Sequence, residues 1–234
     1  MLSPAHLELT PTEKLRVGIN FGNTVLVKKD QNGAPKGIAV DLARELERRL
    51  GIPIEFVTYD AAGRMADGAR QAAWDVAFLG ADADRAHEIT FTAPYLEIDS
   101  TYLVPQESPF WMPAEVDCDG SRIAVSDKSA YDLFLTRTLR HAQLMRAPGP
   151  AASVELFFRE RLDALAGIRP MLIDVAEEHH GMRVLDGRFA TVQQAIGVPR
   201  GRDAAAQYLN GFVEDIIASG FVKKTIEKNG IRGV

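Results

Sequence analysis

The sequence lacks the features of a disulfide-stapled, membrane-embedded or nucleic-acid-binding protein. It contains one cysteine, Cys118, which excludes an internal disulfide and a cysteine-rich zinc site. Charged residues interrupt every apolar run well before the ~18 residues that a membrane-spanning helix needs. The formal net charge of −5 leaves no general basic field to hold nucleic acid or an anionic membrane. Met1–Thr12 has neither the basic start nor the apolar stretch of a secretory signal, so we expect no signal of the usual pattern there.

The sequence also lacks the short motifs by which many enzymes are recognised. It contains no G-x-x-x-x-G-K-[ST], G-x-G-x-x-G or G-x-S-x-G pattern, so neither a phosphate-binding loop nor a serine nucleophile elbow is supported. Glu177–His180 groups acids with histidines, but adjacent helical residues point in different directions, which favours a solvated helix end over a metal site. We therefore expect no catalytic residue, no cofactor and no metal.

What the chain does contain is the composition of an ordinary globular protein. Its 234 residues suffice for one large domain or two small ones, at ~150 residues per domain. Apolar residues make up 46% and charged residues 25% of the chain, which are typical globular values. A folded protein with a sizeable hydrophobic core is expected.

The first part of the chain alternates short apolar strands with amphipathic helices. Strands are predicted over Lys14–Asn20, Ile54–Thr58 and Asp75–Leu79, and the last is apolar on both faces, as in a strand inside a parallel sheet. A helix is predicted over Asp41–Gly51, where leucines recur at a spacing of four, and a weaker one over Ala61–Ala73. Parallel strands joined by helices predict an α/β fold.

A second block repeats this alternation. Ser129 opens its first helix and has Asp132 three residues further on, close to a capping box. The strands predicted in this block and the tail are Arg122–Val125, Ala142–Arg146, Leu162–Gly167 and Thr191–Val198. The helices predicted there are Ser129–Arg140, Ser153–Arg161, Asp203–Ser219 and Gly220–Lys228. Two such blocks without a flexible linker indicate two lobes joined by strands.

The stretch Trp74–Tyr95 contains the most informative side chain. A buried strand ends at Gly80, a short polar loop follows, and Arg85 lies just beyond it. In open α/β sheets ligands bind at the carboxyl ends of the strands, and the planar guanidinium of arginine suits a carboxylate. On residue type alone, a surface arginine paired with Asp82 or Asp84 remains an alternative.

This stretch, with Thr90–Tyr95 reading TFTAPY, resembles the bacterial extracellular solute-binding proteins of family 3, which serve polar amino-acid import. The resemblance covers nearly the whole chain, and the order and spacing of its pieces together are specific. The matching pieces are Lys14–Asn20, Gly37–Gly51, Trp74–Gly80 with Arg85, Phe91–Tyr95, Arg122–Ala130, Ala195–Gly201 and Ser219–Gly230.

The resemblance implies a type II periplasmic-binding-protein fold with two α/β lobes that close over a ligand. Each lobe would be a mostly parallel sheet flanked by helices. Lobe 1 is expected to contain residues 1–98 and 195–234, and lobe 2 residues 99–194. The two hinge strands are expected near Glu97–Tyr102 and Ala190–Gln194.

The resemblance also implies the ligand site. Arg85 matches the position that binds the ligand's α-carboxylate, and Gly80 lets the backbone approach the ligand. Ser129 and Ala130 match the turn at a helix N-terminus whose hydroxyl and N–H groups complete that grip, which is a sound anion site. The remaining candidates lie at strand ends that line the cleft in the family: Asn20, Phe21, Asn23 and Gln194.

The chain departs from the family where the ligand's ammonium is usually held. Ile168 and Asn20 stand where acids are expected, and Arg169 follows directly. An ammonium buried without a carboxylate would cost several kcal/mol. The hypothesis is therefore a carboxylate ligand that is not a standard α-amino acid, with Arg169 either facing a second anionic group or pointing to solvent. An inward turn of Asp82 or Asp84, which would serve an amine, stays an alternative.

The predicted function is that of the substrate-binding component of an ABC importer. Its expected partners are a small anionic or zwitterionic solute and the transporter permease, with no nucleic acid, and the chain is expected to be monomeric and periplasmic. Two alternatives stay open: a periplasmic enzyme similar to cyclohexadienyl dehydratase, and the ligand-sensing module of a larger receptor.

Overall fold

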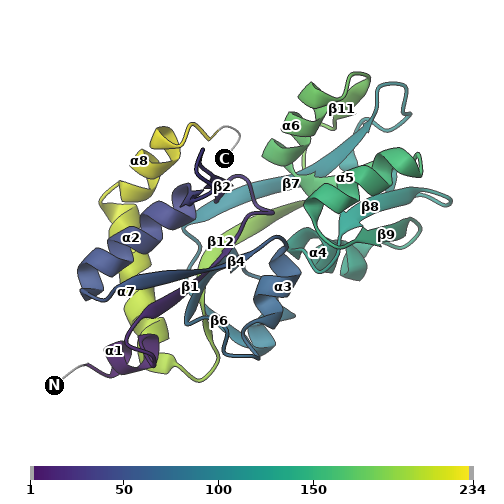
Figure 1. The fold of residues 1–234 in the computed structure, drawn as a ribbon. Helices are drawn as coiled ribbons and strands as arrows, with labels where there is room; N and C mark the ends of the chain where they lie inside the picture. The colour runs from purple at the N-terminus through teal and green to yellow at the C-terminus, as the bar shows by residue number, and fades with distance from the viewer. Residues whose placement is uncertain (1–2, 232–234) are drawn as a thin grey trace. The chain divides into compact units, whose positions relative to one another are not determined.

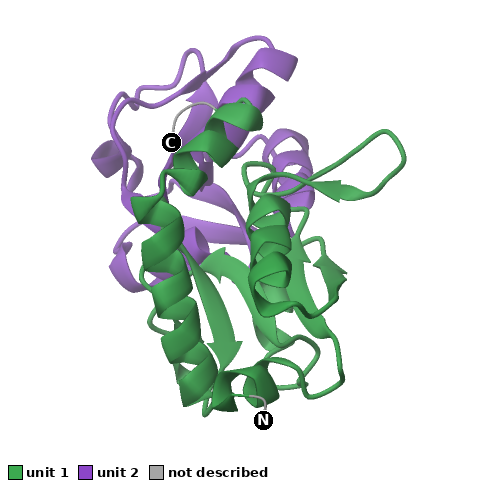
Figure 2. Ribbon diagram, turned by 90° about the vertical axis from the view of Figure 1, so that its left-hand side faces the viewer, with its two compact units in different colours: residues 1–96, 193–231 green, residues 97–192, 232–234 purple. Residues whose placement is uncertain are grey.

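The computed structural model describes residues 3–231 and divides them into two compact units, coloured separately in Figure 2. Unit 1 contains residues 3–96 and 193–231, and unit 2 contains residues 97–192. The chain therefore passes from one unit to the other twice. Each unit combines a sheet with helices, as the alternation of strands and helices predicts.

The sheet of unit 1 is built around a fully buried strand. Its order is β4 (Ile54–Tyr59), β1 (Leu15–Asn20), β5 (Val76–Gly80) and β12 (Ala190–Pro199), and β6 (Ile89–Phe91) pairs with β12. β4, β1 and β5 run parallel to one another, whereas β12 is antiparallel to β5. All residues of β5 are buried, which agrees with its apolar sequence.

The helix α2 (Ile38–Leu50) covers this sheet through a stripe of leucines. Leu42 and Leu46 are completely buried in it, and Gly51 ends the helix in the left-handed conformation, with φ 67°, as predicted. The predicted start at Asp41 is wrong, because the helix begins at Ile38, directly after Gly37. Gly37 has φ 128°, a backbone conformation that residues with a Cβ atom rarely adopt. This conformation sets the start of the helix.

The helix α3 (Ala62–Asp67) is shorter than the predicted Ala61–Ala73. At Gly68 the chain lies so close to its neighbours that a Cβ atom there would be 2.7 Å from the Tyr59 hydroxyl. The buried Trp74 indole donates a hydrogen bond to the Met65 carbonyl at 2.8 Å. Gly68 still has helical angles, with φ −62° and ψ −22°, and the chain has left helical geometry at Ala72, whose φ is 48°.

Three more helices complete unit 1: α1 (Pro4–Leu9), α7 (Asp203–Ala218) and α8 (Phe221–Lys228). The last two agree closely with the helices predicted at the end of the chain. α8 lies beside both α7 and α2 (Figure 1). The small hairpin β2–β3 (Lys28–Lys29 and Pro35–Lys36) contains an Asn-Gly pair in its turn, Asn32 and Gly33, with φ 81° at Gly33.

A buried carboxylate, Asp75, binds two arginines at the end of the sheet where β5 begins. Asp75 is completely buried and accepts hydrogen bonds from the Arg16 backbone N–H at 3.0 Å, from Arg16 Nε at 2.9 Å and from Arg16 Nη2 at 2.8 Å. Arg202 Nη1 donates a further bond to it at 3.0 Å. The network joins β1, the start of β5 and the start of α7.

The sheet of unit 2 has the order β7 (Leu96–Pro105), β10 (Ala164–Ile168), β8 (Arg122–Ser126) and β9 (Gln143–Ala147), and β11 (Met182–Val184) pairs with β7. β10, β8 and β9 are parallel, and β7 is antiparallel to β10. The helices are α4 (Ala130–Thr138), α5 (Pro150–Arg159) and α6 (Arg169–Glu178). α5 starts earlier than its predicted Ser153 because Pro150 suits the first turn of a helix.

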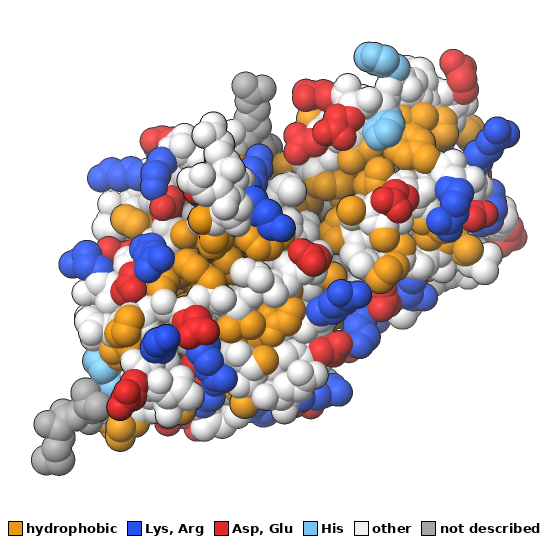
Figure 3. Space-filling model, in the orientation of Figure 1, with side chains coloured by type: hydrophobic (Ala, Val, Ile, Leu, Met, Phe, Trp, Pro, Cys, Tyr) orange, Lys and Arg blue, Asp and Glu red, His pale blue; other side chains and the backbone are white. Residues whose placement is uncertain are grey.

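The surface carries charges of both signs. Lys and Arg side chains are interspersed with Asp and Glu side chains over the face drawn in Figure 3, in keeping with the small net charge. No helix within residues 3–231 is both long enough and apolar enough to cross a bilayer.

Candidate functional site

The last residue of β1 and the loop after it carry three of the predicted site residues, and two of their side chains hold the loop backbone. Asn20 is buried, and its Oδ1 accepts a hydrogen bond from the Gly22 N–H at 2.9 Å. Asn23 Oδ1 accepts from the Val25 N–H at 3.2 Å. The Phe21 ring lies under the Lys29 ammonium, 4.8 Å from its centroid, which is cation–π geometry. Both amide oxygens therefore shape the loop.

Arg85 lies just beyond the end of the neighbouring strand β5, in a short 3-10 turn. Its side chain is buried, with the residue only 6% exposed, so it is not a surface arginine. Nη1 donates a hydrogen bond to the Gly80 carbonyl at 2.7 Å. The guanidinium is thereby held against the last residue of β5.

Gln194 is brought to the same place by the pairing of β12 with β5. Its register partner is Gly80, and the residue is only 2% exposed. The Tyr95 N–H donates to the Gln194 carbonyl at 2.9 Å, which brings Tyr95 to this strand end as well. Among residues 3–231, the buried Gln194 Oε1 and Tyr95 hydroxyl find no hydrogen-bond partner. Burial also raises the pKa of the Tyr95 phenol above its ordinary value of 10, so the phenol is neutral.

Unit 1 therefore collects the predicted residues at two adjacent strand ends. Gly80, Arg85 and Gln194 meet at the end of β5, and Asn20 closes β1, which pairs with β5 directly. The carboxyl ends of parallel strands are where open α/β sheets bind ligands. Tyr95 is the residue that sequence reasoning missed, although it closes the TFTAPY stretch; only the backbone bond to Gln194 assigns it here.

In unit 2 the predicted anion turn is a well-formed helix start. Ser129 caps α4, and its Oγ accepts a hydrogen bond from the Asp132 N–H at 3.1 Å, as the near capping box predicts. The buried Asp132 carboxylate in turn accepts from the Lys128 N–H at 2.8 Å and from Arg146 Nε at 3.1 Å. Among the described residues, the Ser129 hydroxyl proton and the Ala130 N–H have no acceptor. Both remain available to an anion.

Arg169 begins α6, and backbone carbonyls of its own unit hold its guanidinium. Nη1 donates to the Leu185 carbonyl at 3.3 Å, and Nη2 donates to the Gly187 carbonyl. The preceding Ile168 is buried and adds no charge. The visible role of Arg169 is thus to fix the segment that follows β11.

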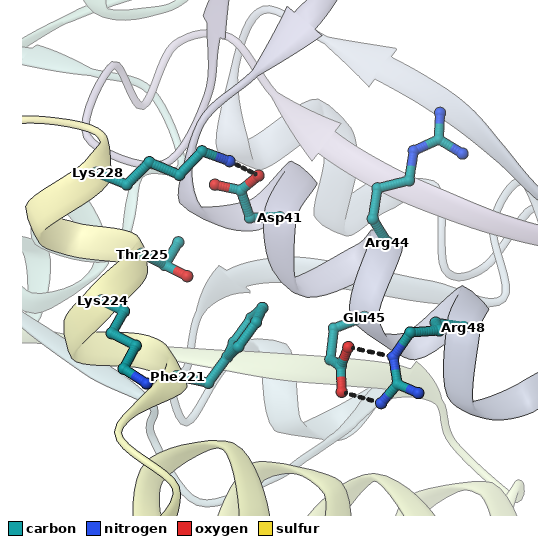
Figure 4. Close-up of a pocket in the computed structure, with 8 residues that line it drawn as sticks. All are labelled: Asp41, Arg44, Glu45, Arg48, Phe221, Lys224, Thr225 and Lys228. Atoms are coloured by element: carbon teal, nitrogen blue, oxygen red, sulfur yellow. Dashed lines mark hydrogen bonds and ion pairs between the residues drawn. The ribbon is translucent and has the colours of Figure 1, made fainter.

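A groove between α2 and α8 contains several charged side chains, but Lys228 pairs with Asp41 and Arg48 pairs with Glu45, both at 2.8 Å (Figure 4). These ion pairs join neighbouring helices or helix turns. Within residues 3–231, no three His, Cys, Asp or Glu side chains gather closely enough to hold a metal ion.

Comparison with known proteins gives a consistent result. The model of one family, bacterial extracellular solute-binding proteins, family 3, matches residues 15–230. A protein of Haemophilus influenzae described as a probable amino-acid ABC transporter-binding protein is 22% identical over 229 residues, which cover 91% of this chain and 83% of that protein.

Two of the solved structures that share the fold illustrate the likeness. The solute receptor for L-cysteine of Neisseria gonorrhoeae has a TM-score of 0.83 at 21% identity, covering 97% of this chain and 93% of that one. An ancestral amino acid-binding protein, a precursor of cyclohexadienyl dehydratase, has a TM-score of 0.80 at 19% identity, covering 97% and 99%. The predicted α/β fold of the type II periplasmic binding proteins is confirmed.

Proposed function

Since the chain belongs to the bacterial extracellular solute-binding proteins of family 3, we propose that it is the substrate-binding component of an ABC importer and binds a small carboxylate-bearing solute. The resemblance stated from the sequence is confirmed by the family match over residues 15–230. The carboxylate is the part of this proposal that depends on individual residues.

Arg85 is the proposed partner of the ligand's carboxylate. Two observations support it: the side chain is buried, and the Gly80 carbonyl fixes the guanidinium at the strand end where α/β sheets bind ligands. A guanidinium binds a carboxylate through two parallel, charge-assisted hydrogen bonds. Held in place before binding, it loses little side-chain freedom when the ligand arrives.

The second half of the grip is proposed to come from Ser129 and Ala130. Their unused hydroxyl proton and N–H group, together with the helix dipole of α4, suit the same negative charge. A ligand that contacts both units would stabilise a closed form by its differential affinity for that form. We propose that Glu97–Tyr102 and Ala190–Gln194 are the hinges. The chain passes from unit 1 to unit 2 directly before Glu97, and it returns between Val192 and Gln193.

The identity of the ligand's other group is proposed from the charges around the site. The named relatives favour an amino-acid-like solute. Ile168 and Asn20 nevertheless provide no carboxylate for an ammonium, which favours a carboxylate that is not a standard α-amino acid. The carbonyl partners of Arg169 support a structural role, so a second anionic group is not part of this proposal.

The proposed partners and place of action follow from the family. As a substrate-binding component, the chain would deliver its solute to the permease of an ABC transporter, act as a monomer and reside in the periplasm. Family members bind solutes, so no catalytic step is proposed. The alternative is an enzyme similar to cyclohexadienyl dehydratase, because a precursor of that enzyme has the same fold. Consumption of prephenate or arogenate by the purified protein would favour this alternative.

Calorimetric titration of small carboxylates into Arg85 variants tests the proposal. Wild-type protein should bind at least one carboxylate, whereas Arg85→Lys, which keeps the charge but loses the planar fork, should bind it at least about tenfold more weakly. Arg70→Ala, which removes an exposed arginine of the same unit, is the matched control and should bind normally. Unchanged affinity in a folded Arg85→Lys protein would refute the assignment.

A further inference from the structure

The Gln194 side chain and the Tyr95 ring lie on one face of the unit 1 sheet. Gln194 stands opposite Gly80, and Ile196 stands opposite Phe78, so these alternate positions share a face. The Tyr95 ring packs edge-on against Phe78, with 6.0 Å between the ring centroids. Gly80, opposite Gln194, has no side chain to fill this face, and its carbonyl holds the Arg85 guanidinium.

The polar atoms at the ends of these two side chains have no hydrogen-bond partner within the described part of the chain. Neither Gln194 Oε1 nor the Tyr95 hydroxyl has a hydrogen bond to any part of the chain between residues 3 and 231, and solvent reaches neither atom. An unsatisfied buried polar group is destabilising, and most such groups in folded proteins are paired. Two of them beside the proposed carboxylate site indicate groups kept for a ligand.

The chemistry of the two groups selects the kind of ligand group. An amide oxygen only accepts hydrogen bonds, while a phenol both donates and accepts. A hydroxyl matches this pair fully, because it donates to Gln194 Oε1 and accepts from Tyr95. An ammonium has only donors, so it cannot accept from the Tyr95 hydroxyl, and the Phe78 ring and the Gly80 backbone on this face carry no negative charge.

We infer that Gln194 and Tyr95 select a carboxylate bearing an uncharged hydrogen-bond donor, a hydroxy acid, over the corresponding amino acid. The inference rests on the proposed function, because Arg85 must hold the carboxylate for the hydroxyl to reach this face. Since solvent does not reach either atom in this conformation, the hydroxyl enters as part of a conformational change.

The test uses pairs of acids that differ only in this group. L-Lactate and L-alanine, L-malate and L-aspartate, and L-phenyllactate and L-phenylalanine are titrated calorimetrically into the whole chain. The hydroxy acid should bind at least about tenfold more tightly than the amino acid in every pair that binds. Gln194→Glu adds a negative charge in the same shape and should reverse that preference.

The neighbouring position offers a matched control. Gln193 is the same residue type, one position earlier on β12, and it is exposed. Gln193→Glu adds the same charge to the other face of the strand and should leave the preference unchanged. If Gln194→Glu does not fold, Gln194→Met and Tyr95→Phe replace it. Each removes one unpartnered polar atom, so each should raise the melting temperature of the ligand-free protein and weaken hydroxy-acid binding.

The outcomes separate the inference from the proposed function. If an amino acid binds more tightly than its hydroxy acid while Arg85→Lys weakens both, the carboxylate function stands and the inference is overturned. The inference is likewise overturned if Gln194→Met lowers the melting temperature and leaves hydroxy-acid affinity unchanged. If no acid in the panel binds, the proposed function fails for small 2-substituted acids, and the inference falls with it.

Discussion

Replacing Asp75 with asparagine should destabilise unit 1 strongly. The carboxylate is completely buried and accepts four hydrogen bonds, three from Arg16 and one from Arg202. Asparagine has nearly the same shape but no charge, so two guanidinium groups would lose their counter-ion. The change therefore isolates the electrostatic part of the network.

The size of the effect follows from burial. Removing one partner of a buried ion pair costs ~3–5 kcal/mol, because the remaining charge is left without compensation. The side chains of Arg16 and Arg202 are 24% and 19% exposed, so water can partly solvate them and the lower end, about 3 kcal/mol, is expected. At ~2–4 °C per kcal/mol for a chain of this size, the melting temperature should fall by about 6–12 °C.

Intrinsic fluorescence provides the assay. The buried Trp74 lies in unit 1 and the exposed Trp111 in unit 2, so a Trp111→Phe background makes the signal specific for unit 1. Glu55→Gln is the control, because the Lys14–Glu55 pair is more than half exposed and should contribute at most ~1 kcal/mol. Equal decreases in the free energy of unfolding for Asp75→Asn and Glu55→Gln, measured by urea titration, would refute the reasoning.

Three further predictions concern stability. Gly68→Ala should cost ~1–3 kcal/mol, since its Cβ would lie 2.7 Å from the Tyr59 hydroxyl, whereas Gly211→Ala in α7 meets no atom within 4 Å and should stabilise by up to ~1 kcal/mol; urea titration compares the two. Hydrogen bonds from Arg48 and Arg49 lower the pKa of Glu45 from 4.5 to about 2, so this carboxylate stabilises the fold above pH 4.5 and the contribution is lost as the pH falls toward 2. The urea midpoint of Glu45→Gln should therefore depend less on pH over that range than the midpoint of the wild-type protein. An equal fall of both midpoints as the pH decreases would contradict the pKa assignment. Ser129→Ala should cost ~0.5–2 kcal/mol through the lost cap of α4, measured by thermal melting, and an unchanged melting temperature would show that the cap contributes nothing.

Strand and helix periodicity predicted most of the sheet and the long helices, because apolar spacing reports directly on burial. The cap of α4 was also predictable, since Ser129 and Asp132 have the spacing that a helix start needs. Errors arose where tertiary packing overrides local preference. The positive φ of Ala72 breaks the helical pattern predicted after α3, and the conformation of Gly37 moves the start of α2.

The candidate site was predictable as a set of strand ends and less so as a set of contacts. The position of Arg85 after β5 follows from the sequence, whereas its bond to Gly80 and the pairing of Gly80 with Gln194 depend on a strand from the far end of the chain. Tyr95 shows the limit most clearly. A tyrosine in an apolar stretch is normally core, and only a long-range backbone bond brings it beside Gln194.

The most direct test of the central claim compares an acid with its uncharged ester. A calorimetric titration measures the affinity of wild-type protein for the best-binding acid of the panel and for the methyl ester of that acid. If the buried guanidinium at the end of β5 binds the negative charge, the ester should bind at least about tenfold more weakly, as expected for the loss of charge-assisted hydrogen bonds. Equal affinity for the acid and its ester would contradict the account.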